Sequence, residues 1–215
     1  MKSTDIYGKI KKEKVICILR GISIEQVVPI AQALHKGGIR LMEITCNTKN
    51  ALEMIEKVSQ AMTGKMIIGA GTVLSKKACE EVLIAGAKFI IAPNVEPEVI
   101  RFCADRDVAV IPGAMTPTEI LRASQLGATM IKIFPAGYLG TDYIKQVRGP
   151  IDNVDFVAVG GIGLENISAF LSAGYCAAGL GGSLVPRTAR KKANRDELTS
   201  LSKKILKKIR DTKDA

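Results

Sequence analysis

The chain has no tryptophan, only 4% aromatic residues and a single histidine, His35, among its 215 residues. One histidine cannot build a His-rich metal site, and the five cysteines include no C-x-x-C pair. No apolar run reaches the ~18 residues that a membrane-spanning helix needs. The charged first residues, MKSTDIYGKIKKEK, also lack the apolar stretch of a signal peptide. These absences argue against a metal centre, a membrane protein and a secreted disulfide-bonded protein, and they favour reduced thiols in the cytoplasm.

The hydrophobic content of 47% suffices for a closed core in one domain of this length. The net charge of +10 is concentrated at the end of the chain, where 11 basic and four acidic residues occur from Arg187 onwards. Apolar residues recur there at helical spacing, namely Leu198, Leu201, Ile205 and Ile209. We therefore expect one domain over residues 1–215 that ends in a docked basic helix at about 187–212. An RNA site is the alternative, but no aromatic residues interleave the charges to stack on bases.

One unit of a short apolar strand followed by a helix recurs along the chain. Apolar, β-branched runs begin near Val15, Arg40, Met66, Lys88, Val108, Thr129, Val154 and Tyr175. Their spacing of 20 to 26 residues leaves room for one helix between successive strands. Glycines precede several runs, where a helix would end in a left-handed residue, at Gly37-Gly38, Gly86, Gly127 and Gly174.

Helix starts are also legible in the sequence. Ser23 with Gln26 forms a capping box, and Thr116-Pro117-Thr118-Glu119 combines a cap, a proline at the first helical position and a glutamate three residues after the cap. Eight strand–helix units in this length favour a closed parallel (β/α)8 barrel of the TIM type. The rival doubly wound sheet would carry G-x-G-x-x-G after its first strand, and that motif is absent there.

Two charged residues interrupt apolar strands. Lys132 lies between Ile131 and Ile133, and Glu43 lies between Met42 and Ile44. Since strand side chains alternate between faces, both should point into the barrel, where burial would lower the pKa of an amine and prepare it to attack a ketone. Glu43 could then act as its proton shuttle. Two other interpretations stay open: a lysine that snorkels to solvent, and a buried ion pair without chemistry.

Glycine-rich turns follow three of the expected strands. Gly160-Gly161-Ile162 and Gly179-Leu180-Gly181-Gly182-Ser183 end the last two strands, where many barrels bind phosphate through backbone N–H groups. The segment Gly69-Ala70-Gly71-Thr72-Val73, which follows an earlier strand, is also rich in glycine. It could equally be a plain turn with Thr72 as a helix cap.

With these residues in place, the sequence resembles the 2-keto-3-deoxy-6-phosphogluconate / 4-hydroxy-2-oxoglutarate aldolase family from about Lys14 to about Pro186. The motifs that carry the resemblance are Glu43-Ile44-Thr45, Gly69-Ala70-Gly71-Thr72-Val73, Ile111-Pro112-Gly113, Lys132-Ile133-Phe134-Pro135 and Gly160-Gly161-Ile162. The resemblance implies a (β/α)8 barrel, a homotrimer, a phosphorylated keto-acid substrate, and neither metal nor cofactor.

The resemblance also assigns roles to individual residues. Lys132 takes the Schiff-base position and Glu43 that of the general acid/base. Thr72 and the turn at Pro93 would contact the pyruvyl carboxylate, and Phe134 would pack against the imine. The phosphate would bind to the late glycine turns, which comprise Gly160, Gly161, Gly181, Gly182 and Ser183.

Three departures distinguish this chain from the gluconate-type pattern. Asn47 replaces an arginine, Ala92-Pro93-Asn94 replaces Ser-Pro-Gly, and Ala158-Val159-Gly160-Gly161 replaces Pro-Thr-Gly-Gly. Together with Arg20, which would be the remaining cation for the substrate, they resemble the branch that cleaves 2-keto-3-deoxy-6-phosphogalactonate. There a valine, here Val159, replaces a threonine that helps to set stereochemistry at C4.

The expected activity is therefore class I aldolase cleavage of a 2-keto-3-deoxy-6-phosphoaldonate to pyruvate and glyceraldehyde 3-phosphate. The galactonate epimer is the first choice, and 4-hydroxy-2-oxoglutarate is an alternative substrate in the same site. A phosphate-binding barrel isomerase or synthase would share the glycine turns without needing Lys132 to form an imine. A non-catalytic binder of anionic metabolites or RNA would have only the basic C-terminal segment in its favour.

Overall fold

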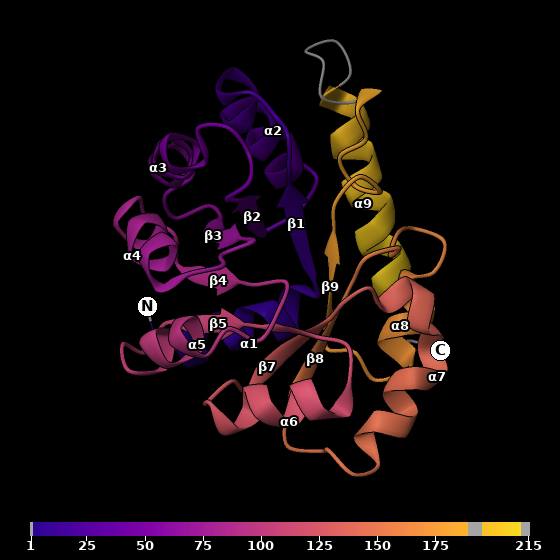
Figure 1. Ribbon diagram of the computed structural model, residues 1–215. Coiled ribbons are helices and arrows are strands. Elements are labelled where there is room, and N and C mark those ends of the chain that lie inside the picture. The colour runs from indigo at the N-terminus through magenta and orange to yellow at the C-terminus, as the bar shows by residue number, and fades with distance from the viewer. Residues whose placement is uncertain (1, 189–194, 212–215) are drawn as a thin grey trace.

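The computed structural model describes residues 2–188 and 195–211 and shows parallel strands in one continuous sheet, ringed by helices (Figure 1). The strands are β1 (Val15–Leu19), β2 (Leu41–Thr45), β3 (Ile67–Gly71), β4 (Phe89–Ile91), β5 (Ala109–Ile111), β6 (Gly113–Ala114), β7 (Met130–Ile133), β8 (Asp155–Val159) and β9 (Ala177–Leu180). The sheet order is β5-β4-β3-β2-β1-β9-β8-β7-β6. Each apolar run that the sequence indicates begins within two residues of an observed strand.

The nine strands correspond to eight barrel strands because β5 and β6 are separated only by Pro112. Proline has no N–H to donate to a sheet, so the ladder breaks there. β5 pairs with β4, whereas β6 pairs with β7, and Lys132 N donates to the Pro112 carbonyl at 2.8 Å. The two halves of this strand therefore join the edges of the sheet, and the predicted (β/α)8 barrel is confirmed.

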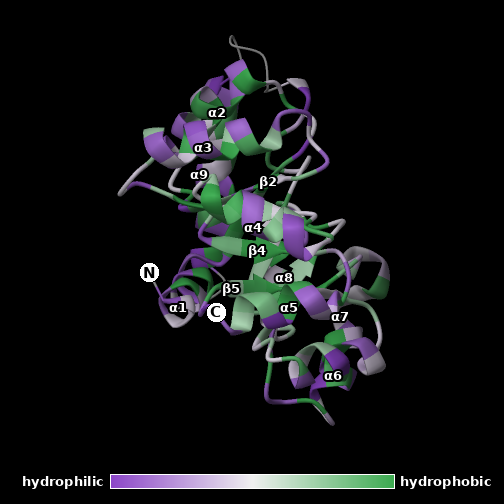
Figure 2. Ribbon diagram, turned by 60° about the vertical axis from the view of Figure 1, so that its left-hand side comes forward, coloured by the Kyte–Doolittle hydropathy of each residue, from purple (hydrophilic) through white to green (hydrophobic). Residues whose placement is uncertain are grey.

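The outer helices are α2 (Ile24–Lys36), α3 (Ala51–Ala61), α4 (Lys76–Ile84), α5 (Pro97–Ala104), α6 (Pro117–Gln125), α7 (Ala136–Arg148), α8 (Ile167–Ser172) and α9 (Arg195–Asp211). The capping boxes expected at Ser23 and Thr116 are both formed. Figure 2 shows hydrophobic residues along the strands and hydrophilic ones on the outer faces of the helices. No helix in the described part of the chain is both long and apolar enough to cross a bilayer.

Helix α1 (Ser3–Glu13) is a feature that the sequence analysis did not anticipate. Its Ile6 and Ile10 are buried among the inward-facing residues of the strands, in the same cluster as Leu41, Phe89 and Met130. The Tyr7 hydroxyl donates to the Val110 carbonyl at 3.1 Å and accepts from its N–H at 2.9 Å. Helix α1 thus covers the end of the barrel from which the strands begin.

The basic C-terminal segment forms a helix that docks on α2. Leu198, Ile205 and Ile209 are buried, while the lysines between them are exposed. The Thr199 hydroxyl donates to the Ala33 carbonyl at 3.0 Å. The expected amphipathic face is present, but α9 begins at Arg195 rather than near residue 187. Residues 187–188 lie in a turn, and 189–194 lie outside the described residues.

The contact between α2 and α9 generates a stability prediction at Gly37. A Cβ built on Gly37 would overlap the Ser202 Cβ and lie 2.9 Å from the Thr199 carbonyl oxygen. Gly37→Ala should therefore lower the free energy of unfolding by about 1–3 kcal/mol, because α9 must shift. Urea denaturation followed by circular dichroism measures this change.

The matched control is Gly8→Ala in α1, where nothing lies within 4 Å of an added Cβ. Alanine there should stabilise the protein by about 0.5–1 kcal/mol, because it restricts the unfolded chain. If Gly37→Ala unfolds at the same urea concentration as the wild type, the close approach of α9 to Gly37 is not a constraint on the fold.

Candidate active site

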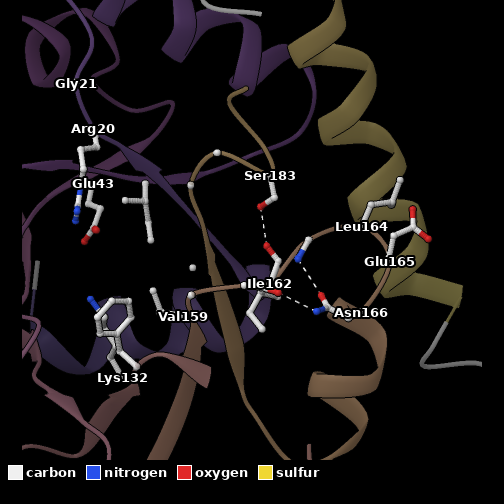
Figure 3. Close-up of a pocket in the computed structure, with 18 of the residues that line it drawn as sticks. Arg20, Gly21, Glu43, Lys132, Val159, Ile162, Leu164, Glu165, Asn166 and Ser183 are labelled. Carbon is white, nitrogen blue, oxygen red and sulfur yellow. Dashed lines mark hydrogen bonds between the residues drawn. The ribbon is translucent and has the colours of Figure 1, made fainter. Parts of the chain in front are cut away.

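A cavity of about 1070 Å³ opens at the carboxyl ends of the strands (Figure 3). Ten of the residues that the sequence analysis selected line it: Arg20, Glu43, Lys132, Phe134, Val159, Gly160, Gly161, Gly181, Gly182 and Ser183. Barrel enzymes hold their chemistry at this end, because loops after every strand converge there. The cavity is thus the candidate active site.

Lys132 projects from β7 into the barrel. Its neighbours Ile131 and Ile133 belong to the core between sheet and helices, whereas Met130 belongs to the cluster inside the barrel. Only 6% of Lys132 is exposed, and its Nζ lies 4.7 Å from the centroid of the Phe134 ring. This burial rules out a lysine that snorkels to solvent. Desolvation lowers the pKa of the Lys132 amine, although the nearby Glu43 charge opposes the shift.

Glu43 projects into the same space from β2, as Figure 3 shows. It is 2% exposed, and its Oε2 has no hydrogen-bond partner in the described structure. Desolvation raises the pKa of the Glu43 carboxyl to about 7, despite the opposing attraction of Lys132 and Arg20. No ion pair within 4 Å joins Glu43 to Lys132 among the described residues. The two groups are therefore not a closed ion pair, and Glu43 can change protonation state near neutral pH.

Gly71 makes room for the glutamate. A Cβ at Gly71 would overlap the Glu43 carboxylate, so a larger residue at this position of β3 would force the glutamate side chain to move. The same strand pairs with β2 in the register Glu43↔Gly69 and Thr45↔Gly71. Close packing thus accounts for both glycines of this segment, Gly71 against the Glu43 carboxylate and Gly69 against the Phe89 ring.

Arg20 extends β1 and reaches across the site to Thr72. Its Nη2 donates to the Thr72 hydroxyl at 3.2 Å. Thr72 does not cap a helix, because α4 begins at Lys76 and Ser75 accepts the capping bond from Ala78 N at 3.2 Å. That alternative is wrong. Thr72 itself lies just outside the residues that line the cavity, joined to them through Arg20.

Pro93 also lies outside the cavity lining. It follows β4, and its carbonyl group lies so close to Gly113 that a Cβ at Gly113 would overlap it. Its observed contact is therefore with the neighbouring barrel strand. The pyruvyl contact that the resemblance assigns to Pro93 remains a prediction.

The two late glycine turns lie against each other. The Ser183 hydroxyl donates to the Ile162 carbonyl at 2.6 Å, which links the turn after β9 to the turn after β8 (Figure 3). Gly160 and Gly161 have φ values of 89° and 75°. A Cβ at Gly160 would lie 3.1 Å from the Phe134 ring, so the turn packs directly on the residue beside Lys132.

Sequence reasoning missed several parts of the wall. Asn166 accepts from Gly163 N and donates to the Gly161 carbonyl, both at 2.9 Å, and so holds the turn after β8 in shape. Glu165 and Arg187 also line the cavity. The position of Asn166, three residues after Gly163, could have indicated from the sequence that its side chain bonds to this turn. Arg187 was not recognised as a cavity residue, because the sequence analysis assigned it to the C-terminal helix.

A barrel with a buried lysine of lowered pKa, beside a carboxyl of raised pKa, has the site of a class I aldolase. The comparisons with known proteins are consistent with this class. The chain belongs to the family described as "KDPG and KHG aldolase", whose model matches residues 6–201.

Individual relatives cover most of the chain. A 2-dehydro-3-deoxy-phosphogluconate aldolase of Treponema pallidum is 34% identical over 94% of this chain and 96% of its own. A probable 2-dehydro-3-deoxy-6-phosphogalactonate aldolase of Rhizobium meliloti is 36% identical, over 79% of this chain and 81% of its own. Relatives named for the two substrate epimers are thus about equally similar.

Solved structures agree with the sequence relatives. A structure described as native KDPGal superposes with a TM-score of 0.87 at 31% identity and covers 94% of this chain and 96% of its own. A KDPG aldolase of Legionella pneumophila, with pyruvate captured as a covalent carbinolamine, has a TM-score of 0.84 at 29% identity over 90% of this chain and 94% of its own.

The raised pKa of Glu43 predicts how stability depends on pH. Below the ordinary value of 4.5, the carboxyl is protonated in both the folded and unfolded chain. Between 4.5 and about 7, the unfolded chain releases a proton that the folded chain retains, so rising pH favours unfolding. Glu43→Gln removes this cost and should raise the free energy of unfolding above pH 7 by about 1–3 kcal/mol.

Thermal unfolding of both proteins at pH 5 and pH 8 tests this prediction. The advantage of Glu43→Gln should be present at pH 8 and should shrink toward pH 5, whereas Glu56→Gln on the exposed face of α3 should unfold like the wild type at both. A Glu43→Gln protein less stable than the wild type at pH 8 would show that the ionised carboxylate stabilises the fold.

Proposed function

We propose that this protein cleaves a 2-keto-3-deoxy-6-phosphoaldonate to pyruvate and D-glyceraldehyde 3-phosphate through an imine on Lys132. The observation that carries the proposal is the 6% exposure of Lys132, inside a barrel and beside a carboxyl group that is 2% exposed. A desolvated amine is neutral at lower pH than a solvated one, and only the neutral amine attacks a ketone. No cofactor is needed for this chemistry.

Imine formation uses both buried groups. The lone pair of Lys132 Nζ attacks C2 of the substrate, and the ketone oxygen takes up a proton as the nitrogen releases one, which gives a carbinolamine. Glu43, through a water molecule, donates the proton with which the hydroxyl leaves as water. A pKa of about 7 lets the Glu43 carboxyl donate this proton and later accept another. The carbinolamine named for the Legionella pneumophila relative supports this sequence of steps.

Bond cleavage follows from the protonated imine. Glu43, or its water, takes the proton of the C4 hydroxyl, and the C3–C4 bonding electrons move toward the imine nitrogen. The C4 fragment leaves as D-glyceraldehyde 3-phosphate, and the remaining three carbons form an enamine. Protonation of C3 and hydrolysis of the imine then release pyruvate and restore Lys132.

Substrate binding divides between two sides of the cavity. Arg20, Thr72 and Pro93 would bind the carboxylate side, supported by the hydrogen bond from Arg20 to Thr72. Phe134 would pack against the imine, as its ring already does beside Lys132 Nζ. Gly160, Gly161, Gly181, Gly182 and Ser183 would bind the phosphate through backbone N–H groups of the two linked turns.

The galactonate epimer is our first choice of substrate. Val159 is 5% exposed at the end of β8, and a Cβ at Gly179 would lie 2.9 Å from its Cγ2. A packed valine offers no hydrogen bond to the C4 region, whereas a threonine would. 4-Hydroxy-2-oxoglutarate is a second candidate substrate for the same lysine. The barrel isomerase or synthase without an imine is not favoured.

Assembly and location are also proposals. We propose a homotrimer on the family resemblance, and the exposed apolar side chains of Leu74, Ile84, Leu121 and Tyr138 on the outer helices and loops offer surface for contacts between subunits. The five free cysteines support a cytoplasmic location, because thiols persist in reducing compartments. We propose no nucleic-acid partner, since no aromatic residues interleave the basic residues of α9 to stack on bases.

The lysine assignment predicts where a covalent adduct forms. Treatment with pyruvate and borohydride should label the wild type at Lys132, which digestion and mass spectrometry can locate. Lys132→Met should remain unlabelled. Lys88→Met, which removes an exposed lysine just before β4, should be labelled like the wild type. A label on another lysine, or none on the wild type, contradicts the imine mechanism and favours the isomerase or synthase.

The epimer assignment predicts the effect of Val159→Thr. The wild type should favour the galactonate epimer, and the added hydroxyl should shift the preference toward the gluconate epimer. One hydrogen bond is worth ~0.5–1.5 kcal/mol, so the ratio of kcat/KM values should change by about two- to tenfold. Val159→Ala serves as the control, because it alters packing without adding a hydroxyl. An unchanged ratio in Val159→Thr would show that Val159 does not set the epimer preference, and Asn47 and Arg20 would be the next residues to substitute.

A further inference from the structure

The charges on the cavity wall are few and unevenly distributed. Among the described residues, three cations line it, namely Arg20, Lys132 and Arg187, together with two carboxylates, Glu43 and Glu165. The substrate of the proposed function carries a carboxylate and a phosphate near −2, so roughly three negative charges enter this space. Each of the three cations must therefore be considered as a partner.

Two of these cations, Arg20 and Lys132, lie where the ketone and carboxylate of the substrate would bind. Arg20 donates to Thr72, and its charge acts on both Glu43 and Lys132. Figure 3 shows Arg20, Glu43 and Lys132 on one side of the cavity, with Ser183 and Asn166 on the other. Lys132 must moreover be neutral when it attacks the ketone. Neither side chain is then available as a permanent charge for the phosphate beside the glycine turns.

Arg187 lies just beyond those turns in the chain. Leu184 N and Val185 N both donate to the Gly181 carbonyl, at 3.0 and 2.9 Å, which folds the segment after β9 into a compact turn. Leu184 and Val185 are 0% and 1% exposed, and Pro186 restricts the next backbone torsion. The buried pair anchors the segment, so the exposed Arg187, which also lines the cavity, is held close in the chain to the glycine turn after β9.

Arg187 is also unpaired among the described residues. None of the four ion pairs includes it, and none includes Glu165. Figure 3 shows the Glu165 carboxylate turned toward α9 and away from Lys132. A cation without a partner, beside turns whose backbone N–H groups carry only partial charges, complements a dianion that those turns alone would not neutralise.

We propose that Arg187 determines specificity for phosphorylated substrates by binding the phosphate group at the rim of the cavity. The proposal rests on the proposed function and adds a charged partner to its backbone phosphate site. Arginine presents a planar fork of N–H donors that matches two phosphate oxygens, and it stays protonated at every working pH. Its contribution belongs to binding rather than to the chemical steps, because it lies far along the substrate from C2.

The experiment compares a phosphorylated substrate with the same 2-keto-3-deoxyaldonate lacking its phosphate. Arg187→Ala should lower kcat/KM for the phosphorylated substrate about 5- to 50-fold, mainly through KM, and should leave the unphosphorylated one within twofold. Arg187→Lys should recover part of the loss, since it keeps the charge without the fork. Rising ionic strength should weaken the wild type more than Arg187→Ala.

Two controls separate a local contact from general charge and folding effects. Arg210→Ala removes an equal charge from the exposed face of α9 and should behave like the wild type with both substrates. Trapping of pyruvate with borohydride reports the imine without a phosphate, so Arg187→Ala should be labelled at the wild-type rate. Equal losses on both substrates, or no loss on the phosphorylated one, would overturn the proposal.

Binding of inorganic phosphate by calorimetric titration makes the test independent of turnover. Arg187→Ala should bind phosphate about 5- to 50-fold more weakly than the wild type, and Arg210→Ala should bind it equally. If the wild type cleaves neither substrate, the proposed function fails, while the titration still decides whether Arg187 binds phosphate. Equal phosphate affinities of Arg187→Ala and the wild type would overturn the inference even if the aldolase activity is present.

Discussion

Lys132 and Glu43 are both withdrawn from water inside one barrel, and the free-energy cost of burying their charges sets the chemistry of the site. Desolvation acts on the two groups in opposite directions: it lowers the pKa of the amine and raises the pKa of the carboxyl to about 7. Their mutual attraction opposes both shifts without cancelling either. The site therefore holds an amine that loses its proton more readily than a solvated lysine, beside a carboxyl that can give and take protons near neutral pH. A closed barrel is suited to this, because strands surround the two groups on all sides.

Close packing around these groups depends on residues without side chains. Gly71 leaves the volume that the Glu43 carboxylate occupies, and Gly160 lets the turn after β8 lie on the Phe134 ring. Phe134 in turn lies 4.7 Å from Lys132 Nζ, measured to its ring centroid. Glycine at these positions thus does more than permit turns. It determines how near the turn after β8 comes to the Phe134 ring beside Lys132, and hence how much space the cavity leaves there.

The two ends of the barrel are built differently, and in the described part of the chain the cavity opens at the end where the strands finish. At the end where the strands begin, α1 buries Ile6 and Ile10 against the inward-facing residues. At the other end the loops leave a cavity of about 1070 Å³. A substrate with anionic groups at both ends would enter there, with Arg20 on one side and Arg187 on the other. The apolar layers below Lys132 then keep water from reaching the amine from beneath.

The sequence alone determined the barrel, the strand positions and the inward direction of Lys132 and Glu43, because period-two alternation and regular strand–helix spacing are local properties of the chain. It could not reveal that Pro112 splits one strand, that α1 closes one end of the barrel, or that Gly71 packs against the Glu43 carboxylate. Nor could it place Arg187 on the cavity wall or show that Thr72 is joined to it through Arg20. Those facts depend on which segments, distant in the sequence, pack together in the fold, and on how much water this packing excludes. Only the closed tertiary structure decides both, so the pKa shifts that make the site reactive belong to the fold rather than to any motif.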